Sequence, residues 1–290
     1  MNALFTRFST VLLLALSLSA KAQSQDELYG QWVERGLKAA AADSLLQAAD
    51  CFERALKTSP EDYRNTLVFS NLAHVQETLY WRDGGVDHRL ADRALESYTL
   101  ALARAPEAVP ILQSRADFLL RLDRIDKAWA DYSAILDIVP ANVEARLHRA
   151  YIAMRRRQWG EARKDYERLL AAEPTHYEAS LGMAVLLQET GRLTEAIDRL
   201  NTLVEHHADK AELYSVRAGV YAQNHQEELA LLDLDKAIGL APENPNFVLA
   251  RAYLHKQQGQ VRLALQDFDR AIALGIPAAQ LRSDMRGLKR

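Results

Sequence analysis

The chain has 290 residues, of which 49% are hydrophobic and 26% are charged, with 12 glycines and 8 prolines. This balance is typical of a folded, helix-rich protein and excludes a disordered chain. The formal net charge of −3 lacks the basic excess of nucleic-acid binding proteins, so we predict no nucleic-acid partner.

Residues 1–22 have the features of a secretory signal peptide. Arg7 supplies positive charge, residues 11–18 are apolar, and Ala20-Lys21-Ala22 has the small-x-small pattern that signal peptidase accepts. The apolar run is shorter than the roughly 20 residues that a membrane-spanning helix needs. We therefore predict cleavage after Ala22 and export of residues 23–290, with an uncleaved anchor as the alternative.

Residues 23–290 repeat one pattern, which is clearest in Val143–Pro174. Two helical sets of apolar and small residues are separated there by a polar turn, which predicts a helix hairpin. Pro174 ends the hairpin, because proline cannot continue a helix. Pro106, Pro140 and Pro174 are spaced 34 residues apart, and Pro242 follows 68 residues later. A 34-residue period of helix, turn and helix indicates a repeat array.

The chain resembles the tetratricopeptide repeat family over nearly all of residues 23–290. The family has a large residue and, four places later, a small one in the first helix, then alanine, an aromatic residue and alanine in the second, and a closing proline. The first repeat carries this pattern as Trp32, Gly36, Ala48, Phe52, Ala55 and Pro60. The resemblance implies an all-α protein, a right-handed α-solenoid of about seven helix hairpins in one domain, with repeats at about 29–62, 66–108, 109–142, 143–176, 177–210, 211–244 and 245–278.

After the seventh repeat, an apolar stripe of Leu281, Met285 and Leu288 predicts a short capping helix within residues 279–290. Such a cap covers the last hairpin and turns a polar face outward.

The second repeat contains extra residues, because Ala94 comes nine residues later than the repeat pattern requires. Asp83-Gly84-Gly85 is a strong turn signal, so we predict a protruding loop over about residues 80–90. Three interpretations stay open for it: a tolerated insertion with Tyr80 and Trp81 on the neighbouring helices, a partner contact, or a metal site without the spacing of a calcium loop. The candidate loop residues are Trp81, Asp83, Asp87 and His88.

Four repeats have an arginine in the first helix and an aspartate sixteen residues later in the second. A short turn would bring these two side chains together, which predicts an Arg–Asp ion pair within each hairpin. The fifth repeat has Met183 and Arg199 at the two places. The alternative is a ladder of arginines that lines a groove and binds an anion. The predicted pairs are Arg115 with Asp131, Arg149 with Asp165, Arg217 with Asp233, and Arg251 with Asp267.

Motifs of the usual phosphate, acyl-transfer and zinc chemistries are missing, including the Walker loop, GxSxG and HExxH. Cys51 is the single cysteine and cannot form an internal disulfide. We therefore predict a protein that is not an enzyme and has no cofactor.

The resemblance implies a concave groove, lined by the first helix of each hairpin, that holds an extended or helical peptide. The matching places lack the Lys and Asn clamp with which chaperone-binding members hold a terminal carboxylate. The positions that correspond to the groove are Ser70, His74, Glu77, Gln113, Asp117, Leu147, Tyr151, Leu181, Val185, Ser215, Leu249, Tyr253 and Lys256.

Together these features predict a non-catalytic scaffold or adaptor, exported to the periplasm or cell envelope of a bacterium, that binds a protein or peptide in its groove. One alternative is a ligand- or metal-binding accessory protein that acts through the loop at residues 80–90. Another is an array that assembles with itself. The sequence names neither the partner nor the oligomeric state, and it predicts no transmembrane helix after signal removal.

Overall fold

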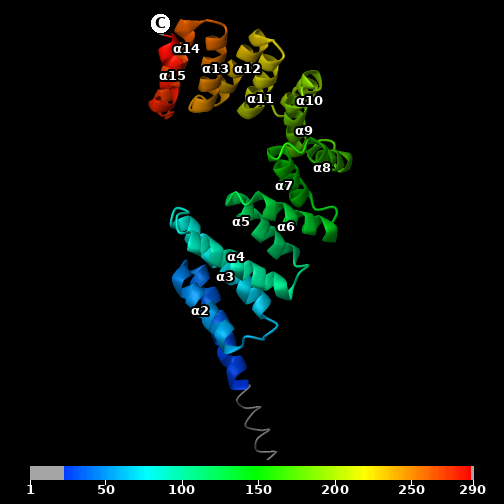
Figure 1. Cartoon of the computed structure of the whole chain (residues 1–290), viewed down its shortest axis with the longest axis vertical. Coiled ribbons are helices and arrows are strands. Elements are labelled where there is room, and N and C mark those ends of the chain that lie inside the picture. Colours follow the sequence, from blue (N-terminus) through cyan, green and yellow to red (C-terminus); the bar gives the residue numbers. More distant parts are fainter. Residues whose placement is uncertain (1–22, 289–290) are drawn as a thin grey trace, which may run out of the picture. The chain divides into compact units, whose positions relative to one another are not determined.

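The computed structural model of the chain describes residues 23–288, and the signal peptide predicted at residues 1–22 lies outside them. The chain divides into two compact parts, Met1–Ala145 and Arg146–Arg290, called the N-terminal half and the C-terminal half. All regular structure within residues 23–288 is helical (Figure 1), so the predicted all-α repeat fold is confirmed. Among these residues, no helix combines the length and the apolar character needed to cross a bilayer. That residues 23–290 form one domain stays a prediction.

The N-terminal half consists of helix hairpins that follow one another along the chain. The first helix packs with α2 and α3 around the buried side chains of Tyr29, Phe52 and Val68. The helices are the one described over residues 23–41, then α2 (Leu45–Thr58), α3 (Asn65–Arg82), α4 (His88–Arg104), α5 (Val109–Arg121), α6 (Ile125–Ile138) and the first residues of α7 (Val143–Arg155).

The C-terminal half continues the same alternation and ends in the predicted capping helix, α15. Leu281 of α15 is buried against Ala252 of α13 and Phe268 of α14, so α15 covers the last hairpin. After the rest of α7, the helices are α8 (Trp159–Ala172), α9 (Tyr177–Glu189), α10 (Leu193–His206), α11 (Ala211–Gln223), α12 (Glu227–Leu240), α13 (Pro245–Gln257), α14 (Val261–Ala273) and α15 (Ala278–Leu288).

The core of each half lies between neighbouring helices and has no single centre, as in other stacked repeats. The second helix of a hairpin places alanine, a bulky residue and alanine on one face. Ala48, Phe52 and Ala55 of α2 are all fully buried. The small residues let the helix backbones approach, and the ring fills the space between them.

The turns inside the hairpins share one backbone geometry. The middle residue of the three-residue turn has a positive φ of 56° to 75° in five consecutive hairpins. Only glycine adopts this conformation without strain, so packing of the two helices holds the other residue types in it. The five residues stand 34 apart and are Asp123, Arg157, Gly191, His225 and Gly259.

The prediction of a protruding loop over residues 80–90 is wrong in extent. The extra residues instead lengthen α3 to 18 residues and α4 to 17, against 13 or 14 in α2 and in α5 to α14, and only residues 83–87 connect them. Tyr80, in the last turn of α3, is buried, and its ring forms a T-shaped pair with that of Phe118 of α5 at 6.0 Å between centroids. Burial of this aromatic residue favours the longer helix over an exposed loop.

Candidate functional site

The thirteen candidate groove residues all lie on the first helices of their hairpins, and none of them is buried. Five belong to α3 and α5 in the N-terminal half, and eight belong to α7, α9, α11 and α13 in the C-terminal half. We call these two sets the N-terminal surface and the C-terminal surface.

The N-terminal surface is a hydrogen-bonded polar network. The hydroxyl of Tyr98, on α4, donates to Glu77 Oε2 at 2.9 Å and lies 3.0 Å from His74 Nδ1. Arg121 Nη1 donates to the other oxygen of Glu77 at 3.2 Å. These contacts hold the Glu77 carboxylate in place at a part-exposed position.

Asp117 is held in a similar way. The hydroxyl of Tyr132, on α6, donates to Asp117 Oδ1 at 2.6 Å, and Gln113 Nε2 donates to the same oxygen at 3.0 Å. Burial, followed by the nearby carboxylate, raises the pKa of both Tyr98 and Tyr132, so both hydroxyls stay protonated as donors. The two tyrosines were missed as site residues, although their hydroxyl distinguishes them from Phe52 and Phe268 at the same repeat position.

The C-terminal surface is more apolar. Tyr151 of α7 is 49% exposed, while Leu181 and Val185 of α9 are partly covered. The guanidinium of Arg155 lies 6.0 Å from the centre of the Tyr151 ring. Tyrosine is enriched among the residues that anchor a partner in an interface.

The far end of this surface differs from the prediction. Lys256 Nζ donates to Asp284 Oδ1 of the capping helix at 2.7 Å, and the Tyr253 hydroxyl donates to Oδ2 at 3.1 Å. The hydrogen bond from Lys256 lowers the pKa of Asp284, so the ion pair persists at neutral pH. The capping helix therefore contacts two residues that were predicted to bind a partner. The contact was not predicted because Asp284 lies outside the 34-residue repeats.

The candidate loop residues do not form a common site. Asp87 Oδ1 accepts from the backbone N–H of Arg89 at 3.0 Å and so caps α4. Trp81 lies on α3, as the interpretation of a tolerated insertion expected, with the Arg121 guanidinium 4.0 Å from its ring centre. Asp83 and His88 are exposed at the ends of the connection. Within residues 23–288, no three His, Cys, Asp or Glu side chains are grouped to hold a metal ion.

The four predicted Arg–Asp pairs are two-point ion pairs. In each, arginine Nε and Nη2 donate to the two carboxylate oxygens over 2.7 to 2.8 Å. Asp131, Asp233 and Asp267 are buried, and Asp165 is fully buried. In the fourth hairpin, Arg146 Nη1 adds a third hydrogen bond to Asp165 at 3.2 Å. The guanidinium edge that would bind an external anion is thus occupied in these four hairpins.

Comparisons with known proteins agree with this geometry. The family model described as the tetratricopeptide repeat matches residues 153–219. No curated protein sequence matches the chain.

Among solved structures, the fold is similar to a tetratricopeptide repeat protein from Parabacteroides merdae, with 23% identity and a TM-score of 0.72 over 91% of this chain and 100% of that one. It is also similar to YrrB, described as a TPR protein with an unusual peptide-binding site, with 21% identity, a TM-score of 0.53, and 70% and 99% coverage. A thermophilic TPR protein of Thermus thermophilus, TTC0263, has 21% identity and a TM-score of 0.54, with 62% and 98% coverage.

Proposed function

We propose that this chain, which matches the tetratricopeptide repeat model over residues 153–219 and shares the fold of such proteins, is a non-catalytic interaction scaffold whose protein or peptide partner binds along the first helices of its hairpins. The observation that carries the proposal is that all thirteen candidate positions stay at least partly exposed on these helices. The peptide-binding site in the description of YrrB, which shares the fold, supports the same use of this one.

The fixed geometry of the N-terminal surface supports binding of a partner. Glu77 and Asp117 are held by tyrosine hydroxyls, so little side-chain entropy is lost when a partner docks on them. Both are carboxylates, so a segment that donates hydrogen bonds or carries positive charge suits this surface. The C-terminal surface, with Tyr151, suits an apolar side chain of the partner.

A matched pair of tyrosine variants tests the surface assignment. Peptides selected from a random display library on immobilised residues 23–290 are expected to bind Tyr151→Ala about tenfold more weakly, because a buried interface tyrosine contributes more than about 1 kcal/mol. Tyr63→Ala serves as the control, since Tyr63 is 86% exposed but lies outside the candidate surfaces. Fluorescence anisotropy gives both affinities. Equal affinities of the two variants would count against the C-terminal surface.

We also propose that the scaffold works in the periplasm or cell envelope of a bacterium, on the strength of the signal-peptide features of residues 1–22. Residues 1–22 fused to alkaline phosphatase, which is active only after export, are expected to give active enzyme in a bacterial host. A fusion with Leu13→Arg and Leu16→Gln inside the apolar run is the control and should lose that activity. Enzyme that stays inactive with the intact leader would contradict export.

A further inference from the structure

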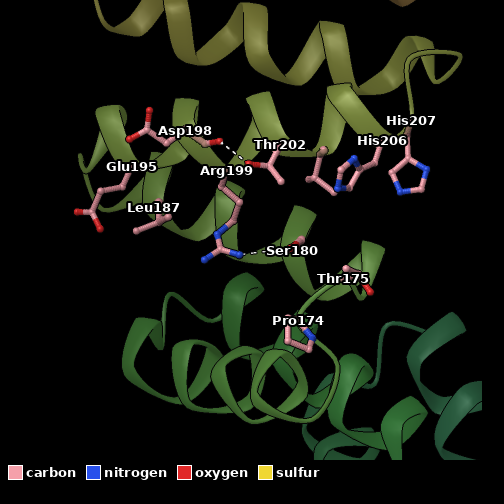
Figure 2. A pocket seen from close by; sticks show the side chains of 11 residues that line it. Pro174, Thr175, Ser180, Leu187, Glu195, Asp198, Arg199, Thr202, His206 and His207 are labelled. Atoms are coloured by element: carbon pink, nitrogen blue, oxygen red, sulfur yellow. Dashed lines mark hydrogen bonds between the residues drawn. The ribbon is translucent and has the colours of Figure 1, made fainter.

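A pocket of about 420 Å³ lies in the C-terminal half, in the fifth hairpin (Figure 2). Ser180 and Leu187 of α9 form one side, Arg199 and Thr202 of α10 the other, and the connection from α8 contributes Pro174. Pockets for small ligands or single side chains begin at about 300 Å³, so this one is large enough for such a group.

The charged residues of this hairpin differ from those of the fourth at the same three places. There, Arg146 and Arg149 of α7 surround the buried Asp165 of α8. Thirty-four residues further on, the two arginine places hold Ser180 and Met183, and the aspartate place holds Arg199. The fifth hairpin therefore has a cation on its second helix and no anion at the two matching places of its first.

Arg199 is left with unused hydrogen-bonding capacity. Its Nη1 donates to Ser180 Oγ at 3.3 Å, while its Nε is buried and has no partner among the described residues. In four other hairpins, Nε and Nη2 of an arginine hold a carboxylate over 2.7 to 2.8 Å. A buried donor without a partner is unfavourable, so an added acceptor would stabilise it.

We propose that this pocket binds a carboxylate group of a ligand, held by Nε and Nη2 of Arg199. The planar guanidinium fork matches the two oxygens of a carboxylate, and Thr202 and Ser180 offer hydroxyls beside it. Leu187 and Pro174 line the rest of the pocket and suit an apolar body behind the acid.

A singly charged acid fits better than a phosphate dianion. Among the described residues, Arg199 is the only arginine or lysine that lines the pocket, and Glu195 and Asp198 also line it. In Figure 2 these two carboxylates lie away from the guanidinium, which points toward Ser180. Arg192 pairs with Glu195, so that charge is partly offset. A second negative charge on the ligand would be repelled by the remaining carboxylate.

The test titrates ¹⁵N-labelled residues 23–290 and follows the Nε–H resonance of Arg199, assigned by its loss in Arg199→Lys. N-acetyl-aspartic acid α-amide supplies a side-chain carboxylate, N-acetyl-leucine supplies a terminal one, and inorganic phosphate is the third probe. At least one acid is expected to shift the resonance, and N-acetyl-asparagine amide, the uncharged counterpart, should not. The acid that shifts it more identifies the source of the carboxylate.

Calorimetry on variants completes the test. Arg199→Lys keeps the charge but loses the planar fork, so we expect a Kd at least about tenfold weaker. The double variant Met183→Arg/Arg199→Asp rebuilds the pair of the other hairpins and should stay helical by circular dichroism yet bind no acid. Unchanged affinity in both variants, no shift with either acid, or a shift with phosphate alone would overturn the proposal.

Discussion

Replacing Asp165 with alanine is expected to lower the free energy of unfolding by about 3 to 5 kcal/mol. Asp165 is fully buried, and three hydrogen bonds from Arg146 and Arg149 end on its carboxylate. The variant would leave two arginines, whose side chains are only 8% and 15% exposed, without that anion. Removing one partner of a buried ion pair is among the most destabilising single changes in a protein. Denaturant unfolding measures the loss, and faster hydrogen exchange in α8 would locate it.

The sixth hairpin offers a control that separates two contributions to the free energy of unfolding. One is the loss from leaving a single charged partner behind, and the other is the net stabilisation by the ion pair. Asp233→Leu alone leaves Arg217 without this carboxylate and should destabilise the chain. Arg217→Met/Asp233→Leu removes both partners and should be nearly neutral, because an apolar pair of similar volume replaces an ion pair without loss. The fifth hairpin already has Met183 at the arginine place. A double variant as unstable as the single one would show that the ion pair itself stabilises the hairpin.

The repeat period predicted the helix hairpins and their ion pairs because both depend on short-range spacing. Sixteen residues separate Arg115 from Asp131, and a three-residue turn is enough to bring them together. The same frame placed all thirteen groove candidates on the first helices, where none is buried, while the groove itself stays a prediction. Features that recur every 34 residues can be predicted from a single sequence, because its repeats can be compared with one another.

The predictions failed or were incomplete where the 34-residue repeat pattern is interrupted. The Gly84-Gly85 turn signal is real, since both residues have positive φ, but it could not show that α3 would extend to bury Tyr80. Asp284 belongs to the cap, so its contacts with Tyr253 and Lys256 have no counterpart in other repeats. The arginine at position 199 is visible in the sequence, but only the structure shows that Arg199 lines a pocket and that its buried Nε has no partner among the described residues.

Alanine substitutions at Gly36 and Gly30, both in the first helix (residues 23–41), are expected to change the free energy of unfolding in opposite directions. A Cβ atom at Gly36 would lie 2.6 Å from Cε1 and 2.8 Å from Cδ1 of Phe52, far inside the roughly 3.5 to 4.0 Å of a carbon–carbon contact. Phe52 is fully buried between Ala48 and Ala55, so its ring has little room to move. Gly36→Ala should therefore destabilise the chain by about 1 to 3 kcal/mol, as other overpacked cores do.

Gly30 is the matched control, because a Cβ atom there meets nothing within 4 Å beyond its chain neighbours and the backbone of its own helix. Gly30→Ala gains only the helix preference of alanine over glycine and should stabilise the chain by up to about 1 kcal/mol. Thermal and denaturant unfolding of both variants measure the two changes in stability. The double variant Gly36→Ala/Phe52→Leu should recover part of the stability lost in Gly36→Ala, because it removes the ring. If Gly36→Ala stabilises the chain as Gly30→Ala does, the ring can shift, and close approach of the helices at this repeat position does not require a residue without a side chain.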